Sequence, residues 1–397
     1  MGKVYIIGTL DTKEAELRYA ERRAEKAGAK VVLVDVSTTP SKAKADVSAR
    51  EVARHHPKGE AAVLGLADRG AAVGAMAEAL SRFLLSRKDI GAVVGLGGSG
   101  NTAIVTAAMR ALPVGVPKLM VSTVASGNVA PYVGPSDIAM MYAVVDVAGL
   151  NAISRKVIAN AAHAAAGMAR NTIKREKADK PGVGLTMFGV TTPCITQIRQ
   201  RIEKDFACFV FHATGTGGQS MEKLVDSGLL ESVIDITTTE VADHLFGGVL
   251  PCTEDRFGSI IRTKIPYVGS VGAVDMVNFG PRETVPKTLE DRKFYIHNPQ
   301  VTLMRTTPAE NRSIGRWIVE RLNRMTGPVR FLLPLRGVSG IDARGQAFHD
   351  EEADTALFAA IREGWIAAKN RGLIEVEAHI NDPAFAAEAV KQFKAIV

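Results

Sequence analysis

The chain has 397 residues, of which 46% are hydrophobic, 23% are charged and 6% are aromatic. This length is too great for one small core and suits two domains, and the composition is globular rather than disordered. The net charge of +7 is scattered, with no run of five Lys or Arg residues, so we do not expect nucleic acid as the main partner. The three cysteines form no C-x-x-C pair, which disfavours a disulfide framework and a zinc site, and we assign no metal ligands.

The N-terminal segment is strand-like from residue 3 to residue 7 and lacks the pattern of a secretory signal. No apolar run approaches the length of a membrane span. We therefore expect a cytoplasmic protein that has no membrane partner.

The first half of the chain alternates short apolar strands with helical segments. Gly28 follows one predicted helix as a C-cap residue would. Such alternation is typical of parallel strands in a doubly wound sheet. The predicted strands are 4–9, 31–36, 92–96 and 117–123, and the predicted helices are 13–27, 69–85, 101–110 and one long helix over 146–170.

The second half repeats this alternation after a polar, charged segment at 171–182. The predicted strands are 183–189, 208–212, 233–237, 266–269, 330–335 and 374–378, and the predicted helices are 196–205, 220–227 and 384–396. We therefore predict an α/β protein of two Rossmann-like doubly wound lobes, residues 1–180 and 181–397, with mainly parallel sheets. Ligands bind at the carboxyl ends of such strands, so we expect a ligand cleft between the lobes.

The strongest local signal for a ligand is a glycine-rich turn between a strand and a helix. Such a turn lets backbone N–H groups approach a phosphate, and the helix dipole favours the negative charge. The alternative is a tight turn without a ligand. The candidate binding residues here are Gly97, Gly98, Ser99, Gly100, Asn101 and Thr102.

Two further strand-to-helix turns have polar, glycine-containing sequences. One comprises Thr214, Gly215, Thr216, Gly217 and Gly218, and the other comprises Gly8, Thr9, Asp11 and Thr12, followed by Lys13. The threonines can donate hydrogen bonds to a phosphate and Lys13 can neutralise it, or Asp11 and Thr12 simply cap the helix. Asp35 ends the second strand, where an acid in dinucleotide folds holds ribose hydroxyls, although a turn role fits equally well.

Polar residues also gather at other predicted strand ends. Ser122 and Ser126 are candidates to line a binding pocket. Glu240, Asp243, Asp275, His297 and Arg305 are candidates for catalysis. Of these, His297 can act as a general base and Arg305 can clamp a carboxylate or phosphate, or either can be structural. We expect Asp275 and His297 in loop-like segments between elements.

Long motifs throughout the chain resemble a widespread bacterial family of unassigned function. They include IGTLDTK at 7–13, GLGGSGNTA at 95–103, FHATGTGG at 211–218 and HNPQVTLMRTT at 297–307. The family is similar to the ATP-binding N-terminal region of a tomato mosaic virus resistance protein. Asn101 stands where we expect a glycine in the family's loop.

This resemblance implies ATP binding, two Rossmann-like subdomains and a homodimer. It also suggests a separate partner resembling the barrel of phosphoenolpyruvate-utilising enzymes. Mg²⁺ is expected through the phosphates and an aspartate. Three hypotheses follow: a nucleotide-binding protein of unassigned reaction, an enzyme acting on a small anionic organic acid, and a non-enzymatic interaction module.

Overall fold

The computed structural model describes residues 2–39, 42–173, 176 and 179–397. The chain divides into two compact units, Met1–Arg175 and Glu176–Val397. Among the described residues, no helix has the length and apolarity that crossing a bilayer requires.

The N-terminal unit has a five-stranded, entirely parallel sheet with the strand order β2-β1-β3-β4-β5. Its strands are β1 Lys3–Gly8, β2 Val31–Asp35, β3 Ile90–Gly97, β4 Lys118–Ser122 and β5 Ile138–Tyr142. Its helices are α1 Leu10–Lys26, α2 Ala49–Ala53, α3 Arg69–Ser86, α4 Ser99–Ala111, α5 Ala130–Val133 and α6 Ala152–Arg170.

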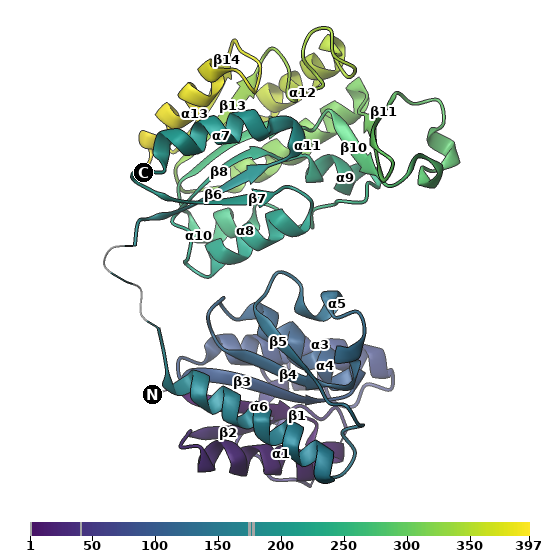
Figure 1. Cartoon of the computed structure of the whole chain (residues 1–397), viewed down its shortest axis with the longest axis vertical. Helices are drawn as coiled ribbons and strands as arrows, with labels where there is room; N and C mark the ends of the chain where they lie inside the picture. The colour runs from purple at the N-terminus through teal and green to yellow at the C-terminus, as the bar shows by residue number, and fades with distance from the viewer. Residues whose placement is uncertain (1, 40–41, 174–175, 177–178) are drawn as a thin grey trace. The chain divides into compact units, whose positions relative to one another are not determined.

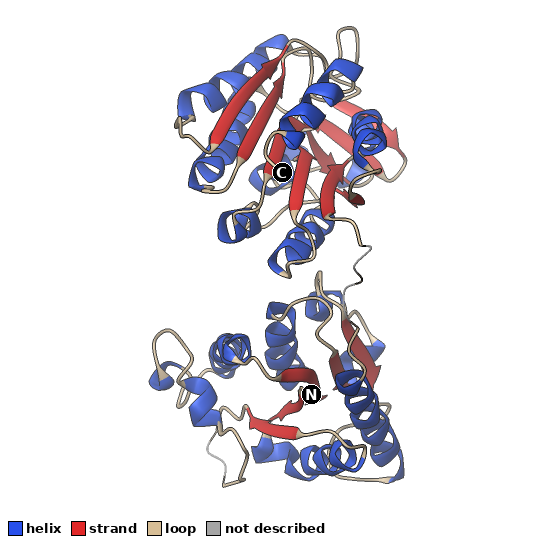
Figure 2. Cartoon of the chain, turned by 90° about the vertical axis from the view of Figure 1, so that its left-hand side faces the viewer, coloured by secondary structure: helices blue, strands red, loops and turns tan. Residues whose placement is uncertain are grey.

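Helices cover both faces of this sheet, which explains why the strands are apolar throughout (Figures 1 and 2). Val4 and Ile6 pack into one core with α1 and α6. Tyr5 and Ile7 pack into the opposite core with α3 and α4. Alternate side chains of β1 therefore enter different cores, as the pleat of a strand requires.

The C-terminal unit has a six-stranded parallel sheet with the strand order β14-β13-β9-β8-β6-β7. Its strands are β6 Gly182–Met187, β7 Ala207–His212, β8 Ser232–Thr237, β9 Tyr267–Gly272, β13 Val329–Pro334 and β14 Arg371–Val376. Its helices are α7 Thr192–Ile202, α8 Thr216–Asp226, α9 Glu240–Phe246, α10 Gly258–Thr263, α11 Pro308–Arg324, α12 Glu351–Gly364 and α13 Pro383–Lys394.

Both sheets are wound in the same order. In each, the second strand lies on one side of the first and the remaining strands continue on the other side. The predicted α/β fold with two Rossmann-like parallel sheets is therefore confirmed. The order reverses between β1 and β3 and between β6 and β8, and ligands of open α/β sheets bind at such points. The predicted cleft between the lobes stays a prediction.

A separate antiparallel sheet in the C-terminal unit corrects the prediction of loop-like segments around Asp275 and His297. It has the order β10-β12-β11, with β10 Met276–Phe279, β11 Phe294–Asn298 and β12 Val301–Arg305. These strands are short and carry polar residues such as Asn278, which is fully buried. Their sequences therefore lack the long apolar runs that identify β1 and β3.

The predicted helix over residues 146–170 was wrong at its start. The helix α6 begins at Ala152, and Asn151 caps it by accepting hydrogen bonds from the N–H groups of Ile153 and Ser154, both at 2.9 Å. Gly149 has a φ of 86° and so cannot continue a helix. Asp146 therefore lies outside the helix, in a segment that contributes to the wall of a cavity.

Candidate functional site

A cavity of about 600 Å³ lies in the N-terminal unit, where the strand order reverses between β1 and β3. Segments that follow β1 and β3 form part of its wall. The predicted binding residues that line it are Thr9, Asp11, Thr12, Gly98, Ser99, Gly100 and Asn101. Position and size are those of a small-molecule site.

The β3–α4 turn presents the N-terminus of α4 to this cavity. Gly98 is the N-cap residue, and none of the side chains that the structure describes caps the helix there. The first N–H groups of an α-helix have no acceptor within the helix, so those of Ser99, Gly100 and Asn101 point outward as donors. The Oδ1 atom of Asn101 is buried and has no partner among the described residues.

The backbone conformation favours glycine at position 97 but not at position 98. Gly97 has a φ of 152°, and a Cβ on it would lie 2.9 Å from the Cβ of Asn101. Gly98 has an ordinary φ of −85°, and a Cβ on it would have its nearest neighbour, Thr123 Oγ1, at 3.8 Å. A side chain at position 98 therefore fits the fold, and because Gly98 lines the cavity it would reduce the space there.

The β1–α1 turn differs because its backbone N–H groups already donate hydrogen bonds to side chains of the protein. The N–H of Leu10 donates to Asp35 Oδ1 at 3.1 Å, and the N–H of Asp11 donates to Ser37 Oγ at 3.1 Å. Asp35 also accepts from the N–H of Ser37 at 2.9 Å. Asp35 thus shapes the turn, and its predicted contact with a ribose stays a prediction.

Two cations face the cavity. Lys13 and Arg69 both line it, and their side chains make no hydrogen bond or ion pair with any residue that the structure describes. The Nη2 atom of Arg69 is 3.6 Å from the point where a Cβ on Gly100 would lie, so this guanidinium is beside the glycine turn. The pair supplies positive charge where an anion would contact the helix N-terminus.

Several lining residues were not predicted from the sequence. Arg69 lies just after Asp68, which caps α3 by accepting from the N–H of Ala71 at 2.6 Å. The helix was predicted over 69–85, but its sequence does not indicate that it begins beside a glycine turn that lies later in the chain. The other unpredicted lining residues that are polar are Thr38, Thr39 and Asp146.

The remaining predicted binding residues of this unit lie outside the lining. A Cβ on Gly8 would be 2.8 Å from the terminal methyl groups of Leu17, so a side chain at position 8 would have to displace them. Thr102 and Ser122 share a buried hydroxyl–hydroxyl bond of 2.6 Å, and Ser126 ends a short 3₁₀ turn. Asp35 lines an adjacent cavity of about 820 Å³, which shares Thr38, Thr39 and Leu66 with the first.

The glycine turn of the C-terminal unit holds a carboxylate of the protein itself. The N–H of Gly215, the N-cap residue of α8, donates to Glu240 Oε2 at 2.8 Å. A Cβ on Gly218 would overlap the Glu240 carboxylate, and one on Gly217 would overlap the carbonyl of His212. Packing therefore accounts for these glycines, and Glu240 takes the place that a ligand anion would have.

Glu240 belongs to a buried cluster around Arg256. This guanidinium contacts Glu240 at 2.6 Å, Asp235 at 2.8 Å and Glu222 at 3.0 Å. Burial raises the pKa of Glu240 and of Glu222 above the ordinary value. The predicted catalytic role of Glu240 stays a prediction, and the contacts show that it joins α8, α9 and the segment before α10.

Asp243 anchors a turn in the same unit. It accepts hydrogen bonds from the N–H groups of Leu250 and Asn278, both at 2.8 Å. Burial raises the pKa of Asp243 to about 6. This carboxyl group connects α9 to β10, and its predicted catalytic role stays a prediction.

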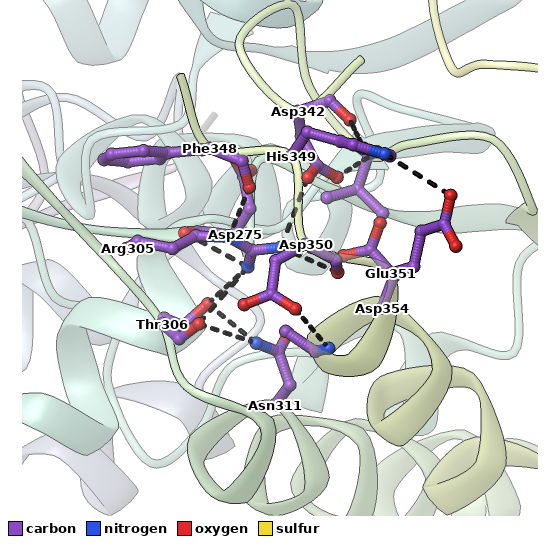
Figure 3. Close-up of polar contacts among 12 residues, drawn as sticks. Asp275, Arg305, Thr306, Asn311, Asp342, Phe348, His349, Asp350, Glu351 and Asp354 are labelled. Atoms are coloured by element: carbon purple, nitrogen blue, oxygen red, sulfur yellow. Dashed lines mark hydrogen bonds and ion pairs between the residues drawn. The ribbon is translucent and has the colours of Figure 1, made fainter. Parts of the chain in front are cut away.

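Asp275 and Arg305, both predicted as catalytic, lie in a second buried cluster (Figure 3). The Nη2 of Arg305 contacts Asp354 at 2.9 Å and Asp342 at 3.2 Å, and its Nε donates to the carbonyl of Phe348 at 2.7 Å. Ser339 donates to Asp275 Oδ2 at 2.8 Å.

This second cluster has more carboxyl groups than cations. Burial raises the pKa of Asp275 to about 6. Burial together with the charges of Asp275 and Asp354 raises the pKa of Asp342 to about 10. Asp342 therefore keeps its proton at neutral pH. Since every nitrogen of Arg305 already has a protein acceptor, its predicted role as an anion clamp stays a prediction.

The structure does not bring His297 to either cluster. It is exposed on β11, and its ring makes no hydrogen bond with a residue in the described ranges. Along β12, Arg305 pairs with Lys293, whereas His297 lies at the other end of the ladder. Within the described part of the chain, no group of three or more His, Cys, Asp or Glu side chains is arranged to hold a metal ion.

Two family models match the chain. They are described as the N-terminal and C-terminal domains of an uncharacterised protein family, UPF0261, and they cover residues 2–174 and 180–397. A UPF0261 protein of Rhizobium meliloti is 57% identical over 100% of this chain and 99% of its own length. Another from Clostridium tetani is 42% identical over 98% of each chain.

A plant protein is also similar to the chain. The ToMV resistance protein Tm-1 of Solanum lycopersicum is 42% identical over 98% of this chain, which spans 55% of the tomato protein's length. Among solved structures, a Streptomyces glycosyltransferase in complex with thymidine diphosphate covers 68% of this chain and 82% of its own. Its identity of 10% and TM-score of 0.18 are too low to support an argument.

Proposed function

We propose that the chain, which belongs to the UPF0261 family, binds a nucleotide, with ATP as the first candidate, at the β1/β3 edge of its N-terminal unit. The observation that carries this proposal is the N-terminus of α4, which no described side chain caps, in a cavity lined by Lys13 and Arg69, two cations without a partner in the described part of the chain. Backbone donors, helix dipole and cations together favour a phosphate there.

A comparison of the three candidate turns supports this choice. In the β1–α1 turn, Asp35 and Ser37 accept the backbone N–H bonds. In the turn before α8, Glu240 accepts from Gly215. An incoming phosphate would have to displace a carboxylate or hydroxyl in both, but it would meet no competing side-chain cap at Gly98.

The adjacent cavity provides room for the rest of a nucleotide. Its volume of about 820 Å³ and its shared wall with the first cavity suit a ribose and a base beyond the phosphates. Asp11 and Asp146 line the first cavity, and Mg²⁺ commonly binds one or two carboxylates together with substrate phosphates. These two residues would hold Mg²⁺ in the proposed complex.

Calorimetric titration of the full chain with ATP, ADP and NAD, with and without Mg²⁺, tests the ligand class. We expect ATP to bind, and we expect Arg69→Ala to weaken it about tenfold or more, because a hydrogen bond to a charged group contributes about 1.5–3 kcal/mol.

The matched control is Arg22→Ala, which removes an exposed arginine of α1 outside the cavity lining. Equal ATP affinity in the two variants would contradict a phosphate site beside Arg69. Absence of nucleotide binding by the native chain would overturn the proposal itself.

A further inference from the structure

A cavity of about 610 Å³ lies in the C-terminal unit and shares no lining residue with the proposed nucleotide site. One face of α12 forms a wall through Glu351, Asp354, Phe358 and Arg362. Further walls come from residues that follow β13 and β14 and from the segment between β13 and α12, which contribute Leu335, Arg336, Arg344, His349 and Glu377. Its position at the carboxyl ends of parallel strands is where such sheets bind ligands.

Three arginines of this cavity keep donors unused. Arg344 is exposed, and its guanidinium makes no hydrogen bond or ion pair within the described ranges. Arg336 and Arg362 are each bound only through Nε, to Glu377 at 3.0 Å and to Glu375 at 2.6 Å. Their Nη groups therefore have no acceptor among the residues described. By contrast, the buried Arg256 and Arg305 have acceptors on every nitrogen.

The carboxylates near the cavity leave the Nη donors of these arginines unused. Asp354 is paired with the buried Arg305 at 2.9 Å. Glu351 and Glu377 have side chains 84% and 68% exposed, so water screens them strongly. Two of the three guanidinium groups thus each share one carboxylate through Nε, with Glu377 and Glu375, while Arg344 has no carboxylate partner among the described residues. Phe358 and Leu335 add an apolar surface.

From these contacts we infer that this cavity is a second ligand site, which takes a small organic phosphate carrying at least two negative charges. Planar guanidinium forks bind phosphate oxygens in pairs, and three segments of the chain each supply an arginine whose Nη groups have no acceptor among the described residues. The apolar surface suits the carbon skeleton of the ligand. The site is independent of nucleotide binding in the other unit.

The test is a calorimetric titration of the full chain with inorganic pyrophosphate at low ionic strength, in a Gly98→Val background that reduces the space of the N-terminal cavity. We expect one binding site, weakened about tenfold or more by Arg344→Ala and also by Arg362→Ala. Arg316→Ala, which removes an exposed arginine of α11 with no partner among the described residues, is the matched control and should bind as its parent does.

Two outcomes would overturn the inference: no pyrophosphate binding by the Gly98→Val protein, or equal affinities of the Arg344→Ala and Arg316→Ala variants. Binding of citrate in place of pyrophosphate would overturn the assignment to phosphates. Because ATP binding is measured separately on the native chain, failure here leaves the proposed nucleotide site untouched.

Discussion

At the scale of single residues, the glycine turns before α4 and α8 have similar sequences but different surroundings. Both turns follow a parallel strand and begin a helix. The Glu240 carboxylate accepts a hydrogen bond from the N–H of Gly215, so a side chain of the protein occupies the anion position in the C-terminal unit. Gly98 has no such neighbour. The Glu240 carboxylate, which comes from a later segment of the chain, therefore determines that the turn before α8 is occupied and the turn before α4 is not.

Asp342 gives a residue-scale prediction about pH. Its pKa is about 10 in the folded protein and near 3.9 in an unfolded chain, so the native state holds an extra proton between these values. The contribution of this proton to the free energy of unfolding is complete below about pH 3.9 and is lost as the pH rises toward 10. The slope is at most about 1.4 kcal/mol per pH unit.

We expect Asp342→Asn to flatten the fall in unfolding free energy between pH 7 and pH 9, as measured by urea denaturation. Asp243 and Asp275, with pKa values of about 6, contribute little slope in this window. Parallel pH curves for the native chain and the variant would show that Asp342 is ionised in the folded protein.

At the scale of elements, the sequence predicts the strands that are both long and apolar. The runs in β1 and β3 are buried on two faces and end in glycine, which leaves little ambiguity. The helices α2, α5, α9, α10, α11 and α12 and the strands β5, β10, β11 and β12 were not predicted. In β5 and β11 most side chains are partly or fully exposed, so burial imposes no clear pattern on the sequence.

The candidate site was predictable only where its residues follow a strand directly. Thr9 and Gly98 follow β1 and β3, and parallel strands bring their ends to one edge. Arg69 and Asp146 reach the cavity from α3 and from the segment before α6, and no local pattern indicates that approach. Glu240 and Asp275, two of the acids predicted as catalytic, are buried beside arginines because distant segments of the chain converge on them.

The edge strand β7 gives an element-scale prediction about self-association. Within the described residues it is paired only with β6, and Phe209 and Val210 on it are 46% and 38% exposed. An apolar edge strand with unpaired backbone groups favours pairing with another chain. We propose that the homodimer implied by the family resemblance forms along β7.

Val210→Lys should convert such a dimer to a monomer in size-exclusion chromatography with light scattering. Val249→Lys, at an exposed valine outside any strand, is the control and should leave the dimer intact. A monomeric native chain, or a Val210→Lys protein that remains dimeric, would rule out this interface.

At the scale of the whole molecule, two units with the same strand order carry different kinds of polar site. The N-terminal unit keeps an open helix N-terminus with cations beside it. The C-terminal unit surrounds two buried arginines with carboxylates. We therefore place the nucleotide in the first unit.

The most direct test of this claim is the ATP affinity of Gly98→Val compared with that of Gly189→Val. Neither position has a backbone conformation that excludes valine or a close neighbour for its Cβ, so both variants should fold. Gly98 lines the N-terminal cavity, whereas Gly189 lies in the other unit. We predict that Gly98→Val loses ATP binding by calorimetry while Gly189→Val binds as the native chain does. Retained binding by Gly98→Val would contradict the account.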